Sequence, residues 1–323
     1  MELTTSENRV IISIKEMREA IKRSGYLLEQ RVVPIFEEHG FFVQTNPIYP
    51  DPDSEKSREI DLDAINVKKI YREGYHFIFP YIICECENNP QPAVFYVRES
   101  PIPFLHCEQA KFSGFPSRIW VRNEYLELNE FLGMEDFHHY CTELVSTQYC
   151  TFQRKKDKKE WMALHGEDQH KTFDSLIKYV EYQMQEHYGL WDDLDKLNQI
   201  DEPEQQDMNV QIYYPLLVFQ GDLYSAYLKN KRLYLKKSNH IQFRKEYFIR
   251  EENKSETYQI DVITESYLER YLDMIEEEVE KIKRVFQRKR KLVFGSMDKI
   301  ITDIKNLETR PDNFLTALEK IFA

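Results

Sequence analysis

The sequence predicts an α/β protein with a mixed central sheet flanked by helices. Apolar runs typical of buried strands occur in both halves of the chain, at 76–87 and again at 212–219. Apolar residues also recur every three or four positions over 13–39 and over 268–286, which is the helical period. Because strands and helices alternate along the chain, we expect one sheet covered by helices.

Composition narrows the function classes. The chain has 323 residues, of which 41% are hydrophobic and 31% charged, so it is long enough for a sizeable core and is not globally disordered. It has only 9 Gly and neither a GxGxxG nor a GxxxxGK[ST] motif, which excludes the common nucleotide-binding loops. The net charge of −12 argues against a general nucleic-acid coat but leaves room for a local basic groove.

Cysteine usage and the first residues bear on location. Five Cys, an odd number without a CxxC motif, indicate reduced thiols and not a disulfide framework or a zinc ribbon. The first ten residues are polar and acidic, unlike a signal peptide, and no apolar run approaches the ~20 residues of a membrane helix. We therefore expect a cytoplasmic protein with no membrane partner.

The first part of the chain predicts a helix followed by a series of strands. The helix covers 13–39, with Gly25 and Pro34 as points where it bends or splits and Gly40 as its end. Pro80 predicts a bulge or bend inside the strand 76–87. The remaining predicted elements are strands at 41–44, 58–65, 93–97 and 118–121 and a helix around 126–144.

We divide the chain into three parts on these patterns. We expect residues 1–150 to form a core, residues 151–209 a helical insertion or lid with a helix near 173–187, and residues 210–323 further strands and a long helix that complete the same domain. A plain linker at 151–209, or two domains divided near 150–210, are the alternatives.

The long helix near the C-terminal end has a regular apolar stripe. Ser266-x-x-Glu269 matches a capping box at its start. Such a helix packs along a sheet or against a partner, so 264–292 is a candidate contact for a homodimer or a partner subunit. The stripe residues are Leu268, Leu272, Ile275, Val279, Ile282 and Phe286.

Acidic side chains gather on the predicted strands. Strand alternation places Glu85 and Glu87 on one face of 76–87, with Cys84 and Cys86 on the other. A buried strand does not carry bare carboxylates without a partner, and oxygen ligands suit Mg²⁺ or Mn²⁺. Asp61 and Asp63 on the preceding strand are placed to face the same spot, and Glu29 on the first helix is a further candidate. The alternative is that these acids point into water or pair with Arg58 and Lys69.

Four motifs resemble the PD-(D/E)xK, restriction-endonuclease-like nuclease superfamily. They cover about a quarter of the chain, and their order matches the α-β-β-β start of that family. By this resemblance Glu29, Asp61 and Glu85 are the metal-binding acids, and the fold is a restriction-endonuclease-like core. The matching runs are 24–29 (SGYLLE), 40–43 (GFFV), 58–61 (REID), and 85–87 with 92–95 (ECE and PAVF).

The sequence departs from that family at Glu87, where the family has Lys. The resemblance implies that the Lys polarises the attacking water. Glu87 instead suits a general base or an extra metal ligand, so Asp61, Glu85 and Glu87 are the catalytic candidates. The other interpretation is a fold that has lost catalysis and is kept for binding.

Phosphodiester binding requires cations, because carboxylates alone repel phosphate. The sequence candidate is the run Arg288, Lys289, Arg290 and Lys291, which lacks acidic neighbours at helical spacing. The cations just before it are explained equally well as a solvated helix end.

His138 and His139 lack a second Cys/His pair at zinc spacing, so packing or a helix surface explains them better than a zinc site. Cys86 faces away from the acids and is interpreted as a packed core thiol.

The sequence thus predicts a metal-dependent nuclease, acting on DNA in prokaryotic defence, restriction or repair. The alternatives are a catalytically inactive binding module of the same fold and a scaffold built on 264–292. Whether Glu87 supports turnover, the choice between DNA and RNA, target specificity, oligomeric state, pathway and partner proteins stay open.

Overall fold

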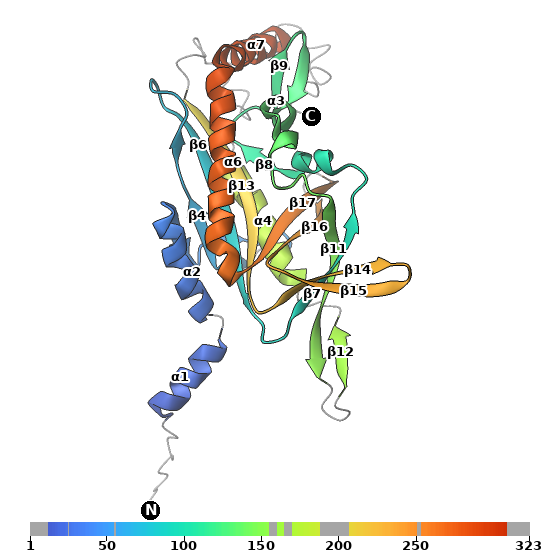
Figure 1. The fold of residues 1–323 in the computed structure, drawn as a ribbon. Coiled ribbons are helices and arrows are strands. Elements are labelled where there is room, and N and C mark those ends of the chain that lie inside the picture. The colour runs from blue at the N-terminus through green and yellow to red at the C-terminus, as the bar shows by residue number, and fades with distance from the viewer. Residues whose placement is uncertain are drawn as a thin grey trace, which may run out of the picture.

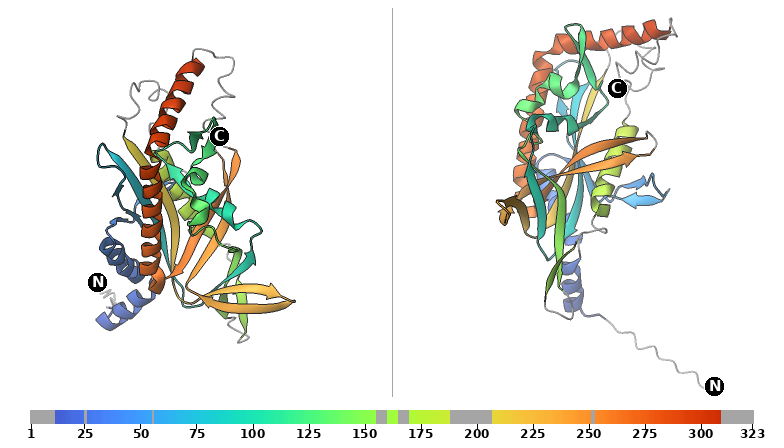
Figure 2. Two further views of the ribbon diagram at one scale, coloured as in Figure 1. Left: turned by 45° about the horizontal axis from the view of Figure 1, so that its top comes forward. Right: turned by 90° about the vertical axis from the view of Figure 1, so that its right-hand side faces the viewer.

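The structure is a computed structural model that describes residues 12–24, 26–54, 56–154, 160–164, 170–187, 207–250 and 253–308. Within these residues a 13-stranded mixed sheet runs through the molecule and helices cover both of its faces (Figures 1 and 2). The predicted class, α/β with a mixed central sheet flanked by helices, is confirmed.

Two long parallel strands form the centre of the sheet. β6 (His76–Asn88) and β13 (Met208–Gln220) pair without a break from Met208–His76 to Gln220–Asn88. Both strands are almost continuously apolar, as expected for parallel strands covered on both faces. The acidic residues of β6, Glu85 and Glu87, lie near the end of this paired stretch.

The rest of the sheet extends on both sides of this pair, in the order β1-β4-β6-β13-β17-β16-β11-β7-β14-β15. Two small sheets, β2 (Ile48–Pro50) with β3 (Ser57–Glu59) and β9 (Arg118–Val121) with β10 (Glu124–Glu127), stand apart from it. The other strands of the large sheet are β1 (Phe42–Thr45), β4 (Leu62–Ile65), β5 (Lys68–Lys69), β7 (Ala93–Glu99), β8 (Lys111–Ser113), β11 (Leu144–Arg154), β12 (Trp161–Leu164), β14 (Leu223–Lys229), β15 (Arg232–Ser238), β16 (His240–Ile249) and β17 (Lys254–Thr264).

One face of the sheet is covered by most of the helices. α2 (Tyr26–Glu38), α3 (Leu128–Leu132), α6 (Leu268–Arg288) and α7 (Arg290–Glu308) contribute to a single core cluster, the first core, together with β6 and β13. α1 (Ile14–Arg23) precedes them, and short 3-10 helices connect other elements: η1 (Pro103–Gln109), η2 (Met134–Asp136) and η5 (Glu265–Tyr267).

The opposite face is covered by α4 (His170–Glu186), which lies across the sheet from α6 (Figure 2, right). Phe173, Leu176, Ile177 and Val180 of α4 are buried in a second core cluster with β6, β7, β13 and β17. The sequence predicted 151–209 as an insertion or lid. The helix described in this segment, α4, packs against the sheet as part of the core. Much of that segment, 155–159, 165–169 and 188–206, lies outside the described residues.

Several predicted elements have different boundaries. The helix predicted over 13–39 is two helices, with Ser24 as the C-cap of the first, and Gly40 has the positive φ of +77° expected after a helix. Pro80 causes no bulge, because its missing N–H faces the gap between the stretches of β6 that pair with β4 and with β5. The helix predicted over 126–144 is only α3 and η2, since Gly133 takes a left-handed conformation at the end of α3.

The long helix α6 confirms its predicted stripe but not its predicted cap. Ser266 forms no capping box, since its hydroxyl contacts Thr264 and the helix begins after η5. All six stripe residues are buried in the first core. The apolar face of 264–292 therefore has its partner inside this chain and is not left for a second subunit.

No helix among the described residues is long and apolar enough to cross a membrane.

Candidate functional site

The acidic residues singled out by the sequence meet where β6 ends. Leu62 of β4 pairs with Cys84 of β6, so Asp61, just before β4, lies beside Glu85. The backbone N–H of Cys86 donates to Oδ2 of Asp61 at 2.7 Å. This hydrogen bond fixes the Asp61 carboxylate against the end of β6.

Asp61 lies at a bend and not within a strand. The predicted strand 58–65 is two strands of different sheets, β3 and β4. Ile60 is buried in the second core, whereas Leu62 and Ala64 are buried in the first, so the chain reverses its face at Asp61. The prediction of a single strand over 58–65 is wrong for this reason.

Asp63 belongs to a separate contact. Its Oδ2 accepts hydrogen bonds from the hydroxyls of Tyr179 on α4 and Tyr81 on β6. Its side chain is buried, and burial raises its pKa against the lowering effect of both hydroxyls. Asp63 therefore helps to anchor α4 on the sheet.

Alternation along β6 separates the acids from the thiols as predicted. Cys84 and Cys86 pack in the first core, while Ile83 packs in the second. The side chains of Glu85 and Glu87 therefore lie on the face of the sheet that α4 covers.

Among these acids, Glu85 has the pKa that is raised most. Burial raises its pKa well above the usual range, and the neighbouring carboxyl of Asp61 raises it further, with a contribution from Glu29 on α2. The pKa of Glu29 is raised by burial and by Asp61, and burial also raises that of Asp61. The structure thus brings Glu29, Asp61 and Glu85 into one electrostatic group.

Glu87 has other neighbours. Burial raises its pKa, while the side chain of Asn89 lowers it through a hydrogen bond. On the sheet, its charge acts on Tyr149 of β11. The structure places Glu87 on the same face as Glu85 but in the direction of β11 and β7.

Tyr49 adds a neighbour that the sequence did not indicate. It belongs to β2, in a segment whose three prolines and acids predicted only a loop. Burial raises the pKa of Tyr49 to about 12, and Glu85 contributes to this increase. Tyr49 thus lies near enough to Glu85 for its hydroxyl to respond to the charge there.

The acids lack cationic partners. Arg58, one predicted partner, pairs instead with Asp51 at 2.8 Å, and Lys178 of α4 pairs with Asp51 and Asp53. Among the described residues, no ion pair joins Glu29, Asp61, Glu85 or Glu87 to a Lys or Arg. The side chains of Asp61 and Glu85 hydrogen-bond to one another instead, and the raised pKa of Glu85 favours its protonated form. The group is therefore a set of partly buried carboxyl groups without a Lys or Arg partner among the described residues.

This donor set suits a hard divalent cation. Carboxylate oxygens are the preferred ligands of Mg²⁺ and Mn²⁺, and a cation would relieve the repulsion that raises the pKa of Glu85. In the described residues, however, Glu29, Asp61 and Glu85 do not form a triple whose ligand atoms all lie within 4.8 Å of one another. Cation binding at this site requires the side chains to draw closer.

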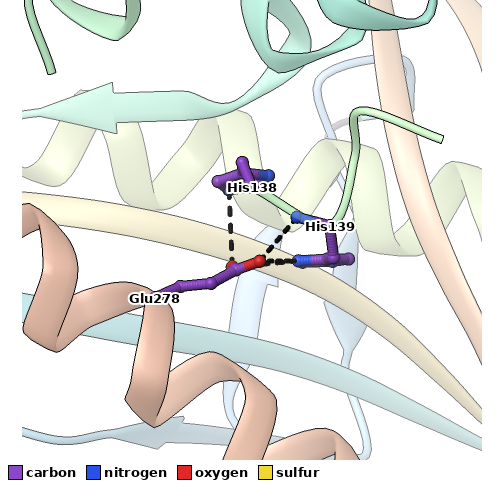
Figure 3. A group of neighbouring side chains, drawn as sticks. All are labelled: His138, His139 and Glu278. Carbon is purple, nitrogen blue, oxygen red and sulfur yellow. Dashed lines mark hydrogen bonds and ion pairs between the residues drawn. The ribbon is translucent and has the colours of Figure 1, made fainter. Parts of the chain in front are cut away.

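A second buried polar group lies under α6. The Nδ1 atom of His139 lies 2.9 Å from both carboxylate oxygens of Glu278 (Figure 3). Its Nε2 lies 2.8 Å from Oδ2 of Asp261 on β17. Asp261 is also contacted by Nε2 of His240 at 2.7 Å and by the hydroxyl of Tyr271 at 2.9 Å. His139 is thus held between two buried carboxylates.

The charges in this group compensate one another. Burial alone lowers the pKa of His139, but Asp261 and Glu278 raise it to about 10. The pKa of Asp261 and that of Glu278 are lowered, because His139 more than offsets their burial. His139 is therefore an imidazolium at neutral pH.

His138, His139 and Glu278 are the described residues whose ligand atoms lie within 4.8 Å of one another. His138 Nε2 lies 3.7 Å from Glu278, but its Nδ1 accepts a hydrogen bond from the N–H of Tyr140. A neutral ring that accepts at Nδ1 carries its proton on Nε2 and offers no lone pair there. The group is an ionic network that attaches residues 138–140 to α6 and β17.

Sequence reasoning missed Glu278 and Asp261. The apolar stripe of α6 concealed a second buried row, Tyr271, Glu278 and Val285, which recurs every seven residues. That spacing beside the stripe was the available signal for a buried glutamate.

The predicted basic run lies far from the carboxylates. Arg290 stacks over Tyr71 and Phe294, and Lys289 contacts the ring and backbone carbonyl of Phe131. These contacts place the run near the beginning of β6. From His76 to Glu85 the strand rises about 3.3 Å per residue, which is about 30 Å.

Comparison with protein families, with curated proteins and with solved structures finds no match to this chain.

Replacing Glu85 by Gln is expected to stabilise the metal-free protein near pH 7. Above the ordinary value of 4.5 the unfolded chain releases a proton that folded Glu85 retains, so the wild type loses stability as pH rises from there towards its folded pKa. Each unit of pKa difference corresponds to about 1.4 kcal/mol, and the variant lacks this loss.

Urea unfolding between pH 4.5 and 8, with a chelator present, measures the effect. Glu277→Gln, an exposed position of α6, is the control. Parallel pH profiles of the wild type and the Glu85 variant would contradict the electrostatic description.

Replacing Glu278 by Gln is expected to destabilise the fold by about 2 kcal/mol or more, because it removes a buried partner of a charged imidazole. The raised pKa of His139 makes its contribution complete below 6.5 and lost as pH rises through about 10. The difference from wild type should therefore shrink between pH 7 and pH 10.

Thermal or urea unfolding of Glu278→Gln and of the exposed control Glu277→Gln at both pH values tests this. Equal stability of the two variants would show that the network does not hold the fold.

Proposed function

We propose that this protein is a metal-dependent nuclease that hydrolyses the phosphodiester bonds of DNA in a prokaryotic defence, restriction or repair role. The observation that carries the proposal is the pairing of Asp61 with Glu85 at the end of a central strand, with Glu29 as their neighbour. Partly buried carboxyl groups that lack a Lys or Arg partner are typical of sites that bind a divalent cation.

The order of elements supports the same proposal. α2 carries Glu29, β4 follows Asp61, and β6 carries Glu85 and Glu87, with β1 between α2 and β4. β1, β4 and β6 are neighbours and antiparallel. A helix followed by three adjacent strands fits the α-β-β-β start of the PD-(D/E)xK superfamily, which the four sequence motifs resemble.

Glu29, Asp61 and Glu85 would hold the cation. When bound, Mg²⁺ or Mn²⁺ polarises the phosphodiester and lowers the pKa of the attacking water. The hydrogen bond from Cys86 N–H orients Asp61.

Glu87 has the place of the Lys of the family. Burial raises its pKa, which suits a group that takes and returns a proton. Its position on the α4 side of β6, next to Glu85 along the strand, allows it to act on the same substrate.

An inactive binding module of the same fold is the second candidate. It is favoured by one observation: among the described residues, no Lys or Arg side chain forms an ion pair with Glu85 or Glu87. The scaffold based on 264–292 has less support, because the apolar face of α6 is buried in the first core.

Glu85→Gln should abolish metal-dependent cleavage, since the amide binds a hard cation poorly and Asp61 loses its partner. Cleavage of single-stranded and duplex DNA and RNA is measured with Mg²⁺, with Mn²⁺ and with a chelator. Glu277→Gln is expected to retain wild-type rates. Undiminished cleavage by Glu85→Gln would assign the activity to another site or to a contaminant.

Glu87 separates an active site from a decayed one. If Glu87 transfers a proton, Glu87→Gln should lose at least about tenfold in rate at saturating metal, because general acid–base groups contribute roughly 10²–10⁴-fold. An inactive wild type that gains cleavage in Glu87→Lys would instead identify a decayed site. Metal binding measured by calorimetry on both variants distinguishes a ligand role from proton transfer.

A further inference from the structure

The β14–β15 hairpin is the most basic part of the described chain outside α6 and its junction with α7. Residues 223–238 contain no Asp or Glu, in a protein of net charge −12. The hairpin projects from the sheet (Figure 1), and every residue from 227 to 237 is exposed. Its cations are Lys229, Lys231, Arg232, Lys236 and Lys237.

The register of the hairpin sorts these residues onto two faces. Ser225 pairs with Lys236, Tyr227 with Tyr234, and Lys229 with Arg232, so these residues share one face, here termed the tyrosine face. The other face carries Ala226, Leu228, Leu233, Leu235 and Lys237.

The tyrosine face combines stacked rings with cations. The rings of Tyr227 and Tyr234 lie 5.3 Å apart at 12°, and the residues are 40% and 41% exposed. Lys229 lies directly opposite Arg232, an arrangement of like charges that destabilises a strand pair. The rings and the charges together form a surface suited to a polyanion with flat apolar groups.

The cations of this face have no acidic partner. Among the described residues, Lys229, Arg232 and Lys236 form no ion pair, whereas Lys237 on the other face pairs with Asp222 at 2.6 Å. The positive charge of the tyrosine face is thus free for a partner, and that of Lys237 is not.

The hairpin begins beside the carboxylates. The N–H of Ala93 donates to the carbonyl of Asp222 at 3.0 Å, and β13 ends with Phe219 in register with Glu87. Leu223 is buried in the second core, the cluster on the side of the sheet that bears Glu85. Alternation from Leu223 therefore directs the tyrosine face to the same side of the sheet.

We infer that the tyrosine face binds a single-stranded nucleic acid, with phosphates contacted by Lys229, Arg232 and Lys236 and unpaired bases stacked on Tyr227 and Tyr234. The inference rests on the proposed nuclease function and names the surface that holds its substrate. From Leu223 to Lys229 the strand spans about 20 Å, enough to follow several nucleotides. This surface replaces Arg288–Lys291, which lies near the other end of β6.

The test is direct binding in the presence of a chelator, so that no cleavage is needed. Fluorescent single-stranded DNA, single-stranded RNA and duplex DNA are titrated with the full-length protein at several salt concentrations. Lys236→Glu is compared with Lys237→Glu, which makes the same change of charge at the next residue but on the opposite face. Both positions are exposed, and circular dichroism checks that both variants fold.

Lys236→Glu should weaken single-strand binding by about tenfold or more and lower the salt dependence, because a phosphate contact is lost. Lys237→Glu should change binding less than threefold. Tyr227→Ser should reduce single-strand binding with the salt dependence retained, because stacking and not charge is removed.

Equal effects of Lys236→Glu and Lys237→Glu, a preference for duplex DNA that Tyr227→Ser leaves unchanged, or loss of binding only in Arg288→Glu would each overturn the inference. Cleavage by the wild type with unchanged binding by Lys236→Glu would leave the nuclease proposal standing without this surface. Binding that depends on the tyrosine face, in a protein that never cleaves, would leave the surface standing without the nuclease.

Discussion

The continuous parallel pairing of β6 with β13 is the constraint on which the rest of the structure depends. The pairing places β6 in the centre of the sheet, where both of its faces are covered along most of its length. Its last residues, at the end of the sheet, are therefore also partly buried. Glu85 and Glu87 occupy that end, and their raised pKa values follow from burial. The same pairing ends β13 beside Glu87, which fixes where the β14–β15 hairpin leaves the sheet.

The two buried acidic groups solve the same electrostatic problem in different ways. Asp261 and Glu278 lower their pKa values by sharing a charged His139, so their network is complete without any other ion. Asp61 and Glu85 have no such partner among the described residues, and their pKa values rise. In the proposed function, a divalent cation takes for Asp61 and Glu85 the role that His139 has in the other group.

The sequence predicted an element correctly where its apolar residues follow a single helical or strand period. It failed where one regular pattern runs across two different elements. β6, β13 and α6 were evident from apolar runs or from the stripe. The alternation over 58–65 was regular, but packing places Ile60 and Leu62 in opposite cores, and this reversal at Asp61 depends on tertiary contacts. Glu29, Asp61 and Glu85 were identified from motifs, whereas the partners of His139 come from β17 and α6, more than a hundred residues away. The strands predicted in this part of the chain, at 212–219, 223–229, 240–248 and 258–264, do not include β15, because its lysines and leucines give no clear strand signal on their own.

Among the described residues, the acids at the end of β6 and the cations of the tyrosine face lie on the same side of the sheet. The carboxylates of Asp61 and Glu85 repel a phosphate, so they cannot bind a nucleic acid without a cation between them and the strand. The cations of the hairpin attract the backbone but hold no group suited to hydrolysis. Each surface is incomplete alone, and a phosphodiester strand with a divalent cation satisfies both. On the proposed function, this complementarity accounts for the like charges at Lys229 and Arg232 and for the acids of β6 that have no Lys or Arg partner within the described chain.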